Sequence, residues 1–421
     1  MAWLLAGMQE GAEALRRSSF HRMNLLTFST LYPNPAHPAH GIFVETRLRH
    51  LLASGAAKAT VLAPVPWFPF SHAAFGEYAG HARTPQREVR NGIEVLHPRY
   101  VVLPKVGMTV APLLLAASAL REARRLLSAG SRFDLLDAHY FYPDGVAAAM
   151  LGARLGLPVV ITARGTDLNL IPRHALPRRM IQWAARKAAG LVTVCQALKD
   201  TLVELGVESS KIEVLRNGVD LDLFRPVDRK AERTQLGLSG QVLLSVGGLI
   251  ERKGHHLAIR GLADLPGAML LVAGDGPEAT NLKKLVGELG LSQRVKFLGE
   301  LNQSELRRYY GAADALVLAS SREGWANVLL ESMACGTPVV ATRVWGTPEV
   351  VAAPEAGVLM AERTPQALAQ AVKQLFARPP DRAATRRYAE GFGWGATTQG
   401  QIELFGRILA GRVRTAPAAG V

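Results

Sequence analysis

The sequence predicts an α/β protein with two domains, each built on a doubly wound parallel sheet. Three observations predict this fold class. The chain has 421 residues, about twice the length of a usual domain, so two separate cores are expected. Short apolar runs alternate with helix signals along both halves, as in strand–helix–strand units. Turn residues interrupt the alternation near the middle of the chain, at Asn217-Gly218 and Pro226.

The first half opens with a buried strand and a helix. Residues 23–30 (MNLLTFST) form an apolar run, and after a Pro-rich turn an amphipathic helix is predicted from Ile42 to Ala53. Further short apolar runs predict strands at Ala59–Ala63, Leu135–Ala138, Pro158–Thr162 and Leu191–Val194. We place the domain boundary in the turn-rich segment Arg216–Pro226, which makes residues 1–22 an N-terminal extension and residues 23–220 the first domain.

The second half repeats the alternation, which makes residues 221–394 the second domain. Its strands are predicted at Val242–Val246, Met269–Ala273, Val295–Leu298, Ala315–Leu318 and Pro338–Ala341. A late helix is predicted over Pro365–Phe376 and a last one over Gln399–Arg412, within the segment 395–412. In proteins with two domains of this kind the last helix commonly crosses back to the first domain, and we expect this here. A cleft between the domains is the expected place for chemistry.

Composition excludes several classes of protein. Only two cysteines occur, Cys195 and Cys335, too few and too far apart for a disulfide framework or a dedicated zinc site, so a reducing cytoplasm is expected. No stretch of about 18 apolar residues, the length that indicates a membrane span, is free of charge. The nearest candidate, Val106–Leu120, contains Pro112 and runs into Arg121, and it predicts a buried or interfacial helix.

The formal net charge of +14 is dominated by arginines spread over predicted helices. The sequence lacks the basic run with interleaved aromatic residues that a nucleic-acid groove needs, so nucleic acid is not an expected partner. A basic face toward the anionic inner leaflet of the cytoplasmic membrane, together with phosphate-bearing substrates, explains the excess. A basic composition with arginine as a solvated surface residue explains it equally well, and both explanations stay open.

The most informative stretch is Ser320–Val340 (SSREGWANVLLESMACGTPVV). Seven residues separate Glu323 from Glu331, and Gly324 opens a helix predicted over Asn327–Ala334. Glu323 then lies in the loop before the helix and Glu331 about one turn into it. The free N–H groups and the positive dipole end at a helix N-terminus form an anion site suited to a diphosphate. A carboxylate beyond the phosphates can bind sugar hydroxyls, and a deeper one can accept both hydroxyls of a ribose.

A Gly-rich turn (VGGLIERKG, residues 246–254) directly follows the first strand of the second domain. Gly247 and Gly248 let the backbone approach phosphates. Arg252 and Lys253 can neutralise a diphosphate leaving group, whose charge grows in the transition state. The turn therefore predicts where a leaving group is stabilised.

The stretch Ser320–Val340 resembles the E-x7-E signature of retaining glycosyltransferases of family 4, and the ACGTPVVAT that completes it is typical of that family too. The resemblance extends from Met23 to about Arg412. It implies the GT-B fold, in which two Rossmann-like domains face each other across a cleft. It also implies transfer of a sugar from a nucleoside diphosphate, UDP or GDP, with retention at the anomeric carbon. Neither a cofactor nor a metal ion is expected.

The resemblance implies roles for individual residues. Glu323 would contact the donor sugar and Glu331 the nucleotide ribose. The loop amides that reach the sugar would come from Gly324, Trp325, Ala326, Asn327 and Val328. The family usually has an arginine at the position of Gly248 and a lysine at that of Lys253. The lysine matches, and Arg252 is the candidate substitute for the arginine, so Glu323, Lys253 and Arg252 are candidate catalytic residues.

The first domain is expected to supply the acceptor side. Gly41 precedes the helix from Ile42 and would let the backbone approach the donor phosphates or the acceptor. His139 in HYFYPDG, and Arg164 and Asp167 in TARGTD, follow predicted strands, where an open α/β sheet presents its ligand-binding groups. We predict all three as acceptor-side residues and His139 also as a catalytic residue. Similar proteins often have a histidine where Arg164 stands.

Two further segments have competing interpretations. Asp220-Leu221-Asp222 has the D-x-D spacing of some metal sites, but it lies in the predicted linker, so a metal site is not expected there. The loop Val65–Phe70 (VPWFPF) either dips into a membrane or holds a lipid acceptor, or else forms a buried apolar cluster.

The expected function is sugar transfer to a sugar or lipid-linked sugar acceptor, in cell-surface polysaccharide or lipid-linked glycan assembly at the inner face of the cytoplasmic membrane. Two alternatives stay open. A nucleotide-sugar epimerase or dehydrogenase shares the alternation of strands and helices but needs G-x-G-x-x-G after its first strand, and residues 28–41 hold one glycine among prolines. A non-catalytic sugar-nucleotide-binding subunit is kept open by the missing arginine at Gly248.

Overall fold

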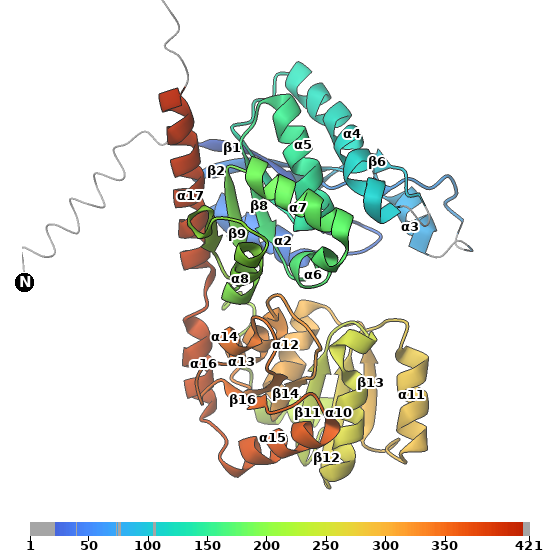
Figure 1. Ribbon diagram of the computed structural model, residues 1–421. Helices are drawn as coiled ribbons and strands as arrows, with labels where there is room; N and C mark the ends of the chain where they lie inside the picture. The colour runs from blue at the N-terminus through green and yellow to red at the C-terminus, as the bar shows by residue number, and fades with distance from the viewer. Residues whose placement is uncertain (1–21, 39, 73, 75–76, 104–106, 416–421) are drawn as a thin grey trace, which may run out of the picture.

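Two mostly parallel sheets, each carried by its own half of the chain, organise the structure. The two lobes lie one above the other in Figure 1, with the first half of the chain in the upper lobe. This arrangement confirms the predicted α/β fold class. The predicted extension, residues 1–22, lies outside the described residues except for Arg22. The computed structural model describes residues 22–38, 40–72, 74, 77–103 and 107–415.

The sheet of the first lobe has eight strands in the order β10-β9-β8-β7-β1-β2-β5-β4, and only β4 and β5 pair antiparallel. The chain builds outward from β1 through β2 on one side and then returns to β7 on the other, so the winding reverses between β1 and β7. The strands are β1 (Met23–Phe28), β2 (Ala57–Leu62), β4 (Arg87–Arg90), β5 (Ile93–Leu96), β7 (Leu135–His139), β8 (Val159–Ala163), β9 (Gly190–Thr193) and β10 (Ile212–Val214).

Helices cover both faces of this sheet. In β1, Leu25 packs with Leu51 of α2 on one face, whereas Leu26 packs with Leu115 of α4 on the other, as the alternation of a strand requires. A separate two-stranded ribbon joins β3 (Val65–Pro66) to β6 (Arg99–Tyr100). The helices are α2 (Ile42–Ala53), α3 (Glu77–Arg83), α4 (Gly107–Ser128), α5 (Val146–Leu155), α6 (Thr166–Asn169), α7 (Ala175–Lys187) and α8 (Gln196–Glu204).

The sheet of the second lobe is entirely parallel, in the order β13-β12-β11-β14-β15-β16. Counted along the chain this is 3-2-1-4-5-6, the order of a doubly wound dinucleotide-binding sheet, and its winding reverses between β11 and β14. The strands are β11 (Gln241–Val246), β12 (Ala268–Ala273), β13 (Val295–Gly299), β14 (Ala315–Leu318), β15 (Val339–Thr342) and β16 (Gly357–Met360). The helices are α9 (Arg229–Leu236), α10 (His255–Gly261), α11 (Ala279–Glu288), α12 (Gln303–Ala312), α13 (Asn327–Ala334), α14 (Thr347–Val350), α15 (Pro365–Ala377) and α16 (Arg382–Glu390).

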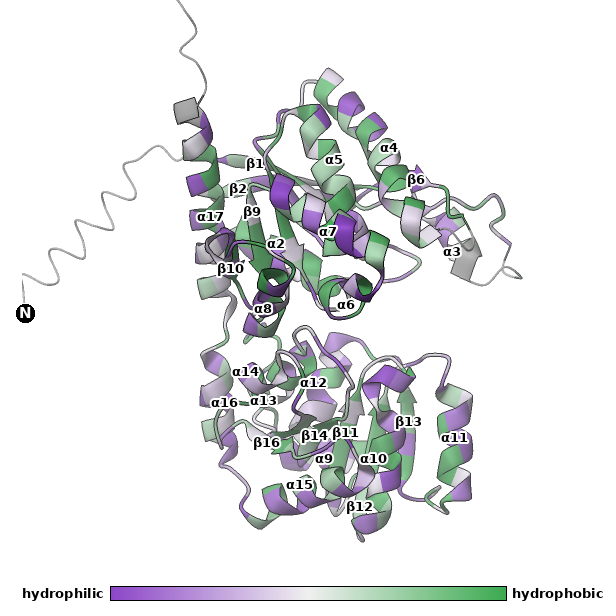
Figure 2. Ribbon diagram, in the orientation of Figure 1, coloured by the Kyte–Doolittle hydropathy of each residue, from purple (hydrophilic) through white to green (hydrophobic). Residues whose placement is uncertain are grey.

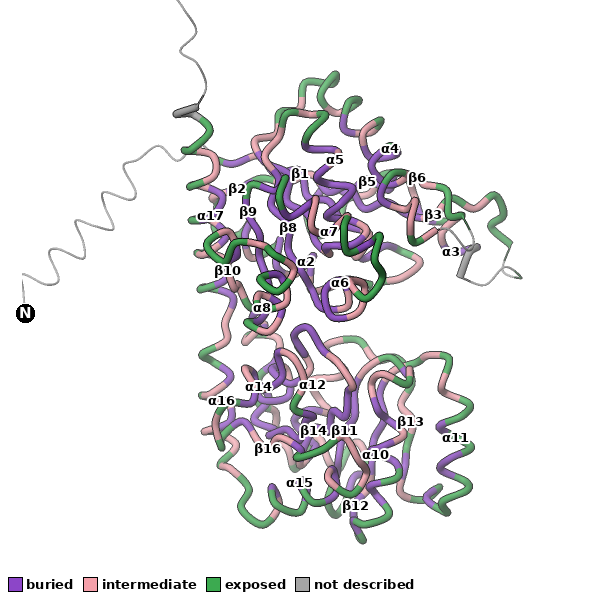
Figure 3. The backbone as a smooth tube through the Cα atoms, viewed as in Figure 1, coloured by how far each residue is buried: buried purple, intermediate pink, exposed green. Residues whose placement is uncertain are grey.

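The strands that the apolar runs predict are all present, within about two residues of the predicted bounds, which is the usual uncertainty of element ends. Figure 2 shows them mostly in the hydrophobic colour and Figure 3 shows most of them buried, with exposed turns on outer helices such as α11; β13, at the sheet edge, is mostly half-buried or exposed. Four strands of the two main sheets were not predicted, namely β4, β5, β10 and β16. β4 (REVR) has a single apolar residue and lies at a sheet edge, and β10 has three residues, so neither gives an apolar run.

The last helix, α17 (Trp394–Thr415), crosses back to the first lobe as predicted, and it starts earlier than the predicted Gln399. Leu404 and Phe405 are buried against the sheet of the first lobe. At the start of the helix the Trp394 ring stacks on His50 of α2, with ring centroids 5.2 Å apart. The last helix of the described residues therefore packs on the domain that contains β1.

The segment predicted as a buried or interfacial helix forms α4, which continues through its arginines to Ser128; Val106 lies outside the described residues. Among the residues that the structure describes, no helix combines the length and the apolar character needed to cross a membrane. In the loop after β3, Trp67 and Phe70 are 54% and 55% exposed, so the interpretation of this loop as a buried cluster is wrong for these two rings.

Candidate active site

The two lobes meet at the loops that follow the carboxyl ends of their strands. Gly165, after β8, and Gly324, after β14, touch backbone to backbone: a Cβ built on Gly324 would lie 1.9 Å from the carbonyl oxygen of Arg164. No side chain fits at either position. Ligands of open α/β sheets bind outside the carboxyl ends of the strands, next to the reversal of winding. This contact therefore marks the candidate active site.

On the second lobe, the carboxylate of Glu323 is held between two cations. Its Oε1 lies 2.7 Å from Nζ of Lys253 and 3.7 Å from Nη1 of Arg252, and it accepts a 2.7 Å hydrogen bond from the Ser320 hydroxyl. Arg252 also donates to the carbonyl oxygen of Arg322. Burial alone would raise the pKa of Glu323, but Lys253, Ser320 and Arg252 together lower it, so the carboxylate is ionised. The structure thus joins three of the predicted catalytic residues.

Glycines bring the basic turn against the end of β14. Gly254 has a φ of 73°, and a Cβ there would lie 2.1 Å from the carbonyl oxygen of Ala319, so only glycine allows this approach. Gly247 has a φ of 143°, and the side chain of Lys253 packs over it. A Cβ on Gly248, in contrast, would have its nearest neighbour at 3.8 Å. The local geometry therefore leaves room for a side chain at Gly248, although the sequence has none.

The start of α13 combines a helix end without a side-chain cap with a half-buried acid. Its N-cap residue, Ala326, has no side chain that could cap the helix, and although the N–H of Asn327 donates to the carbonyl of Trp325 (3.1 Å), the positive end of the helix remains a candidate anion site. Glu331 accepts a 2.9 Å hydrogen bond from the hydroxyl of Tyr310, and burial raises the pKa of Glu331 to about 7. Glu331 and Asn327 line a narrow cavity of about 40 Å³ against Phe43 of α2. The two predicted acids thus lie on different sides of the helix start.

On the first lobe, His139 belongs to a buried chain of hydrogen bonds. Its Nε2 lies 3.1 Å from Oδ2 of Asp137, and Arg164 donates to its Nδ1 over 2.7 Å. Because arginine only donates, we assign the proton of the imidazole to Nε2. Burial is the main cause that lowers the pKa of His139 to about 4, so the ring is neutral. Arg164 donates to Asn217 (2.8 Å), whose amide donates to Asn327 of α13 (3.3 Å), which links the two lobes.

The other predicted residues of the first lobe shape its loops. The carboxylate of Asp167 accepts hydrogen bonds from the backbone N–H groups of Phe141, Arg164 and Gly165, and its side chain is fully buried. It therefore holds the turn that presents Arg164. Gly41 has a φ of 67°, and a Cβ there would lie 2.3 Å from the carbonyl of Leu31, so glycine is required for this loop to close onto α2.

Comparison with known sequences decides the family. Residues 40–223 match the family described as "Glycosyltransferase Family 4", and residues 228–392 match "Glycosyl transferases group 1". D-inositol 3-phosphate glycosyltransferase from Mycobacteroides abscessus is 33% identical over 298 residues, 66% of this chain and 67% of that one. The enzyme of the same name from Frankia alni is 31% identical over 306 residues, 66% of this chain and 75% of that one. The chain belongs to glycosyltransferase family 4.

Solved structures show the same fold as this family 4 glycosyltransferase. Sucrose-phosphate synthase from Thermosynechococcus elongatus has a TM-score of 0.75 at 20% sequence identity, and the match covers 93% of this chain and 100% of that chain. HepE of Anabaena, solved in complex with UDP, has a TM-score of 0.69 at 22% identity, over 91% of this chain and 100% of that one. The likeness confirms the GT-B fold, and the family excludes the alternative of an epimerase or dehydrogenase.

Sequence reasoning missed several polar residues of this family 4 glycosyltransferase. Asp137 faces His139, and Arg47 of α2 is 1% exposed and donates to the carbonyl of Leu215. Arg47 stands in a helix predicted to be amphipathic, in which a charged residue is expected on the solvent-facing side. The neighbouring sequence therefore does not indicate that Arg47 is buried. Asn217 was noted only as turn chemistry, although it joins the lobes.

Asp144, in the run HYFYPDG, was missed as well. Its carboxylate accepts hydrogen bonds from the backbone N–H (2.7 Å) and the hydroxyl of Thr30, which ties the loop after β1 to the turn after β7. Burial raises the pKa of Asp144 to about 7. The two loops at the reversal of winding are thus joined through one acid.

The D-x-D segment has a structural explanation. Asp220 Oδ1 accepts hydrogen bonds from the backbone N–H groups of Asp222 (3.1 Å) and Leu223 (2.9 Å), the pattern of an aspartate that stabilises a turn. Among the residues that the structure describes, no group of three or more His, Cys, Asp or Glu is placed to hold a metal ion.

Proposed function

We propose that this family 4 glycosyltransferase transfers a sugar from a nucleoside diphosphate, UDP or GDP, to an acceptor hydroxyl with retention and without a metal ion or cofactor. Residues 221–394 would bind the donor and residues 23–220, with the last helix, the acceptor. The observation that carries the proposal is the placement of Glu323 between Lys253 and Arg252 beside the uncapped start of α13. HepE, solved with UDP and, in another structure, with UDP-glucose, supports a nucleotide-sugar donor.

In the proposed reaction the bond between the anomeric carbon and the diphosphate oxygen breaks, and the negative charge on the diphosphate grows. Lys253, Arg252 and the N-terminus of α13 would stabilise that charge, which is the role a divalent cation has in other transferases. Their present partner, Glu323, would exchange these cations for hydroxyl groups of the donor sugar. Glu331 would accept the ribose hydroxyls.

The acceptor oxygen would attack the same face that the diphosphate leaves, and the leaving phosphate would take the acceptor proton. In the structure both nitrogens of the His139 ring already face Asp137 and Arg164. We therefore propose that His139 acts on the reaction by holding Arg164, which in turn faces Asn217 at the cleft.

A screen of donors tests the proposal. We expect one of the UDP, GDP or ADP sugars to raise the melting temperature of the full chain, because a ligand at 100 times its Kd stabilises by about 2.7 kcal/mol. With that donor, NMR of the product should show the anomeric configuration of the donor. An inverted product would refute retention, and stabilisation that requires added Mg²⁺ would refute metal independence.

Gly248 keeps a second function open, that of a sugar-nucleotide-binding subunit without turnover. The family arginine is absent there although the local geometry would accommodate a side chain. Release of the nucleoside diphosphate by the wild type, lost in Glu323→Gln but kept in the surface control Glu300→Gln, would decide for the enzyme. Binding of the donor without any release would decide for the subunit.

We further propose that the protein works at the inner face of the cytoplasmic membrane, as a peripheral enzyme of cell-surface polysaccharide or lipid-linked glycan assembly. The net charge of +14 and the exposed rings of Trp67 and Phe70 support this setting. Co-sedimentation with phosphatidylglycerol vesicles, but not with phosphatidylcholine vesicles, is the expected result.

A further inference from the structure

An apolar cavity of about 250 Å³ lies beside the N-terminal half of α4, in the first lobe. It exceeds the roughly 150 Å³ that holds a benzene molecule in a protein core. Its lining consists of three tyrosines and otherwise of glycine, proline and apolar side chains, among them Val102, Met108, Ala111 and Leu114. None of the residues to which we assign catalysis or donor binding is part of the lining.

The outer wall of this cavity exposes aliphatic side chains to solvent. Val101, Val102 and Leu103 are 47%, 48% and 41% exposed, and Met108 is 44% exposed. The exposed Trp67 stands on a neighbouring segment, because its backbone N–H donates to the carbonyl of Tyr100 over 2.7 Å. Exposed apolar residues that gather in this way indicate an interaction site in a folded protein.

The inner end of the cavity reaches the cleft. Tyr140 directly follows His139 and has a φ of 82°, a strained conformation for a residue with a side chain, of the kind that clusters at functional sites. Tyr140 lines the cavity, and the preceding residue, His139, accepts the hydrogen bond from Arg164, which also donates to Asn217 between the lobes. A molecule in the cavity would therefore end beside the first-lobe residues that face the cleft.

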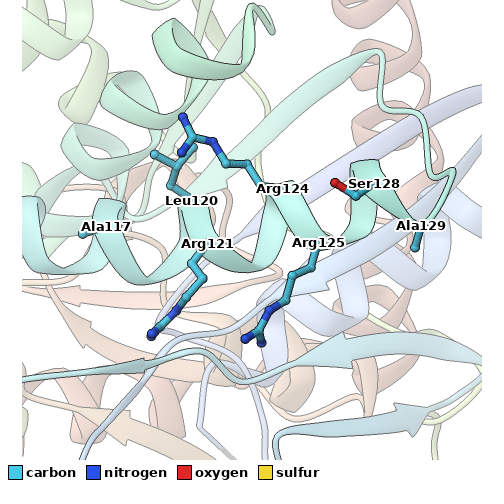
Figure 4. Close-up of a pocket in the computed structure, with 7 residues that line it drawn as sticks. All are labelled: Ala117, Leu120, Arg121, Arg124, Arg125, Ser128 and Ala129. Atoms are coloured by element: carbon cyan, nitrogen blue, oxygen red, sulfur yellow. The ribbon is translucent and has the colours of Figure 1, made fainter.

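The remainder of α4 carries a positive charge. Arg121, Arg124 and Arg125 surround a shallow depression on its C-terminal half, and Figure 4 shows their side chains extending away from the helix. The only acidic residue of α4, Glu122, pairs with Arg125. A helix with exposed apolar residues at one end and an excess of arginine over acidic residues at the other fits the boundary of an anionic membrane.

We propose that the cavity binds the hydrocarbon chain of a phosphate-bearing lipid acceptor, whose chain enters past the exposed aliphatic wall and whose polar end meets the cleft at Tyr140. This inference rests on the proposed function, because it names the acceptor class of the same reaction. The occupant is an amphiphile, since the apolar cavity lies on the same helix as an arginine-lined depression and includes Tyr140, the neighbour of His139. The arginines of α4 would contact lipid head groups.

Photolabelling tests the proposal on the full chain. The reagent is farnesyl phosphate with a diazirine at the far end of its chain, in vesicles of phosphatidylglycerol and phosphatidylcholine. We expect labelled peptides from residues 100–103, 107–114 and 140–143. Val102→Asp should lower labelling roughly tenfold or more, because an unpaired charge in an apolar wall is strongly disfavoured. Its matched control, Val89→Asp, changes a valine of β4 that is 73% exposed, and should label normally.

A second pair of variants fills the cavity without adding charge. Ala111 lines the cavity, whereas Ala117 lies on the arginine-bearing depression of the same helix. Ala111→Trp should lower labelling as Val102→Asp does, and Ala117→Trp should not. Label found only on residues 117–129, or unchanged labelling in both Val102→Asp and Ala111→Trp, would place the chain on the helix surface and overturn the proposal.

Sedimentation and nucleotide binding separate the other outcomes. Dimers that Val102→Asp disperses, with no labelling of the wild type, would assign the apolar wall to an interface between two copies and overturn the lipid site. Thermal stabilisation by UDP or GDP without any labelling would overturn the lipid site alone. Specific labelling without stabilisation by any nucleotide sugar would instead leave the lipid site standing and refute the proposed function.

Discussion

The two halves of the candidate site hold their charges in different ways. In the second lobe Lys253, Arg252 and Glu323 pair at the rim of the cleft, with side chains 17%, 25% and 8% exposed, so a ligand can replace one partner. In the first lobe Asp137 is 1% exposed and lies among cations that are themselves buried. Arg47 keeps its Nε and Nη2 without a hydrogen-bond partner. The ion pairs at the rim are placed so that a ligand can replace one of the partners, whereas the side chains of the buried cluster are held in one arrangement.

This contrast teaches where substitutions should act. A charge at the rim should matter chiefly to the reaction, since Arg252 and the Ser320 hydroxyl still hold Glu323 when Lys253 is removed. A charge in the buried cluster should matter chiefly to stability, because removing one partner leaves the others buried and uncompensated.

The largest effect is expected at the rim. Lys253→Met should lower the rate of transfer by about 10²–10³-fold, the usual result of removing one group that stabilises developing charge, with little change in thermal stability. Steady-state kinetics and a melting curve check both. Lys283→Met, which removes a surface lysine of α11 near Phe297, is the control and should change neither. A large fall in the melting temperature of Lys253→Met would show that the rim residues also carry stability, and would contradict the contrast between the rim and the buried cluster.

The next effect concerns the buried cluster. Asp137→Asn should cost about 3–5 kcal/mol of unfolding free energy, because Arg47 and Arg164 would lose their compensating charge. Urea unfolding measures it, and Asp222→Asn, at an exposed position, is the control. The double variant Asp137→Asn/Arg47→Met should regain part of the loss. Equal stability of the single variant and the wild type would show that the cluster is not a charge-compensated unit.

A smaller effect is expected with pH, from one acid in each half. Burial raises the pKa of Glu331 and that of Asp144 to about 7. The folded chain keeps these protons where the unfolded chain has lost them, so stability should fall as the pH rises from about 4 to 7, by at most about 1.4 kcal/mol per pH unit for each group. Unfolding curves across this range should flatten in Glu331→Gln and in Asp144→Asn.

Donor binding separates the two acids. If Glu331 accepts ribose hydroxyls as a carboxylate, the affinity for UDP or GDP rises with pH through this range, and Glu331→Gln abolishes the rise. Asp144→Asn should leave it in place, because Asp144 contacts Thr30 within the first lobe. Loss of the pH dependence in both variants would contradict the assignment.

The smallest effect is expected at an exposed contact between the lobes. Arg216 donates to Oε2 of Glu349 over 2.6 Å, and Oε1 of Glu349 accepts from the backbone N–H of Gln196 at the start of α8. Because the arginine is 47% exposed, Glu349→Gln should cost about 0–1 kcal/mol of stability. Glu288→Gln, in an exposed pair within α11, is the control. A loss comparable to that of Asp137→Asn would show that exposure does not govern the difference.

The sequence predicted the second-lobe site better than the first for a physical reason. Glu323 and Lys253 each stand in a short segment between a strand and a helix. The neighbouring residues in each segment therefore suffice to predict that the side chain is part of a binding site. The buried cluster takes Arg47 from α2, Asp137 from β7 and Asn217 from the segment between the sheets. Their meeting depends on how the elements pack, which no local spacing records.

The fold follows the same rule. β11 and β12 read as continuous apolar runs because both faces of a parallel strand are covered, whereas β4 at the sheet edge reads REVR and was missed. The helix that contains Val106–Leu120 in the prediction continues as α4 to Ser128, because arginines are good helix formers and project outward there. The burial of a strand can thus be predicted from the sequence, whereas the contact partners of a side chain in distant segments cannot.

Where Gly165 and Gly324 meet, the lobes present main-chain atoms to each other. Neither residue has a side chain that could rotate away, so a carbon atom added at either position has to be accommodated by a shift of the backbone. The spacing of the lobes at this point is thus set by two peptide chains in direct contact.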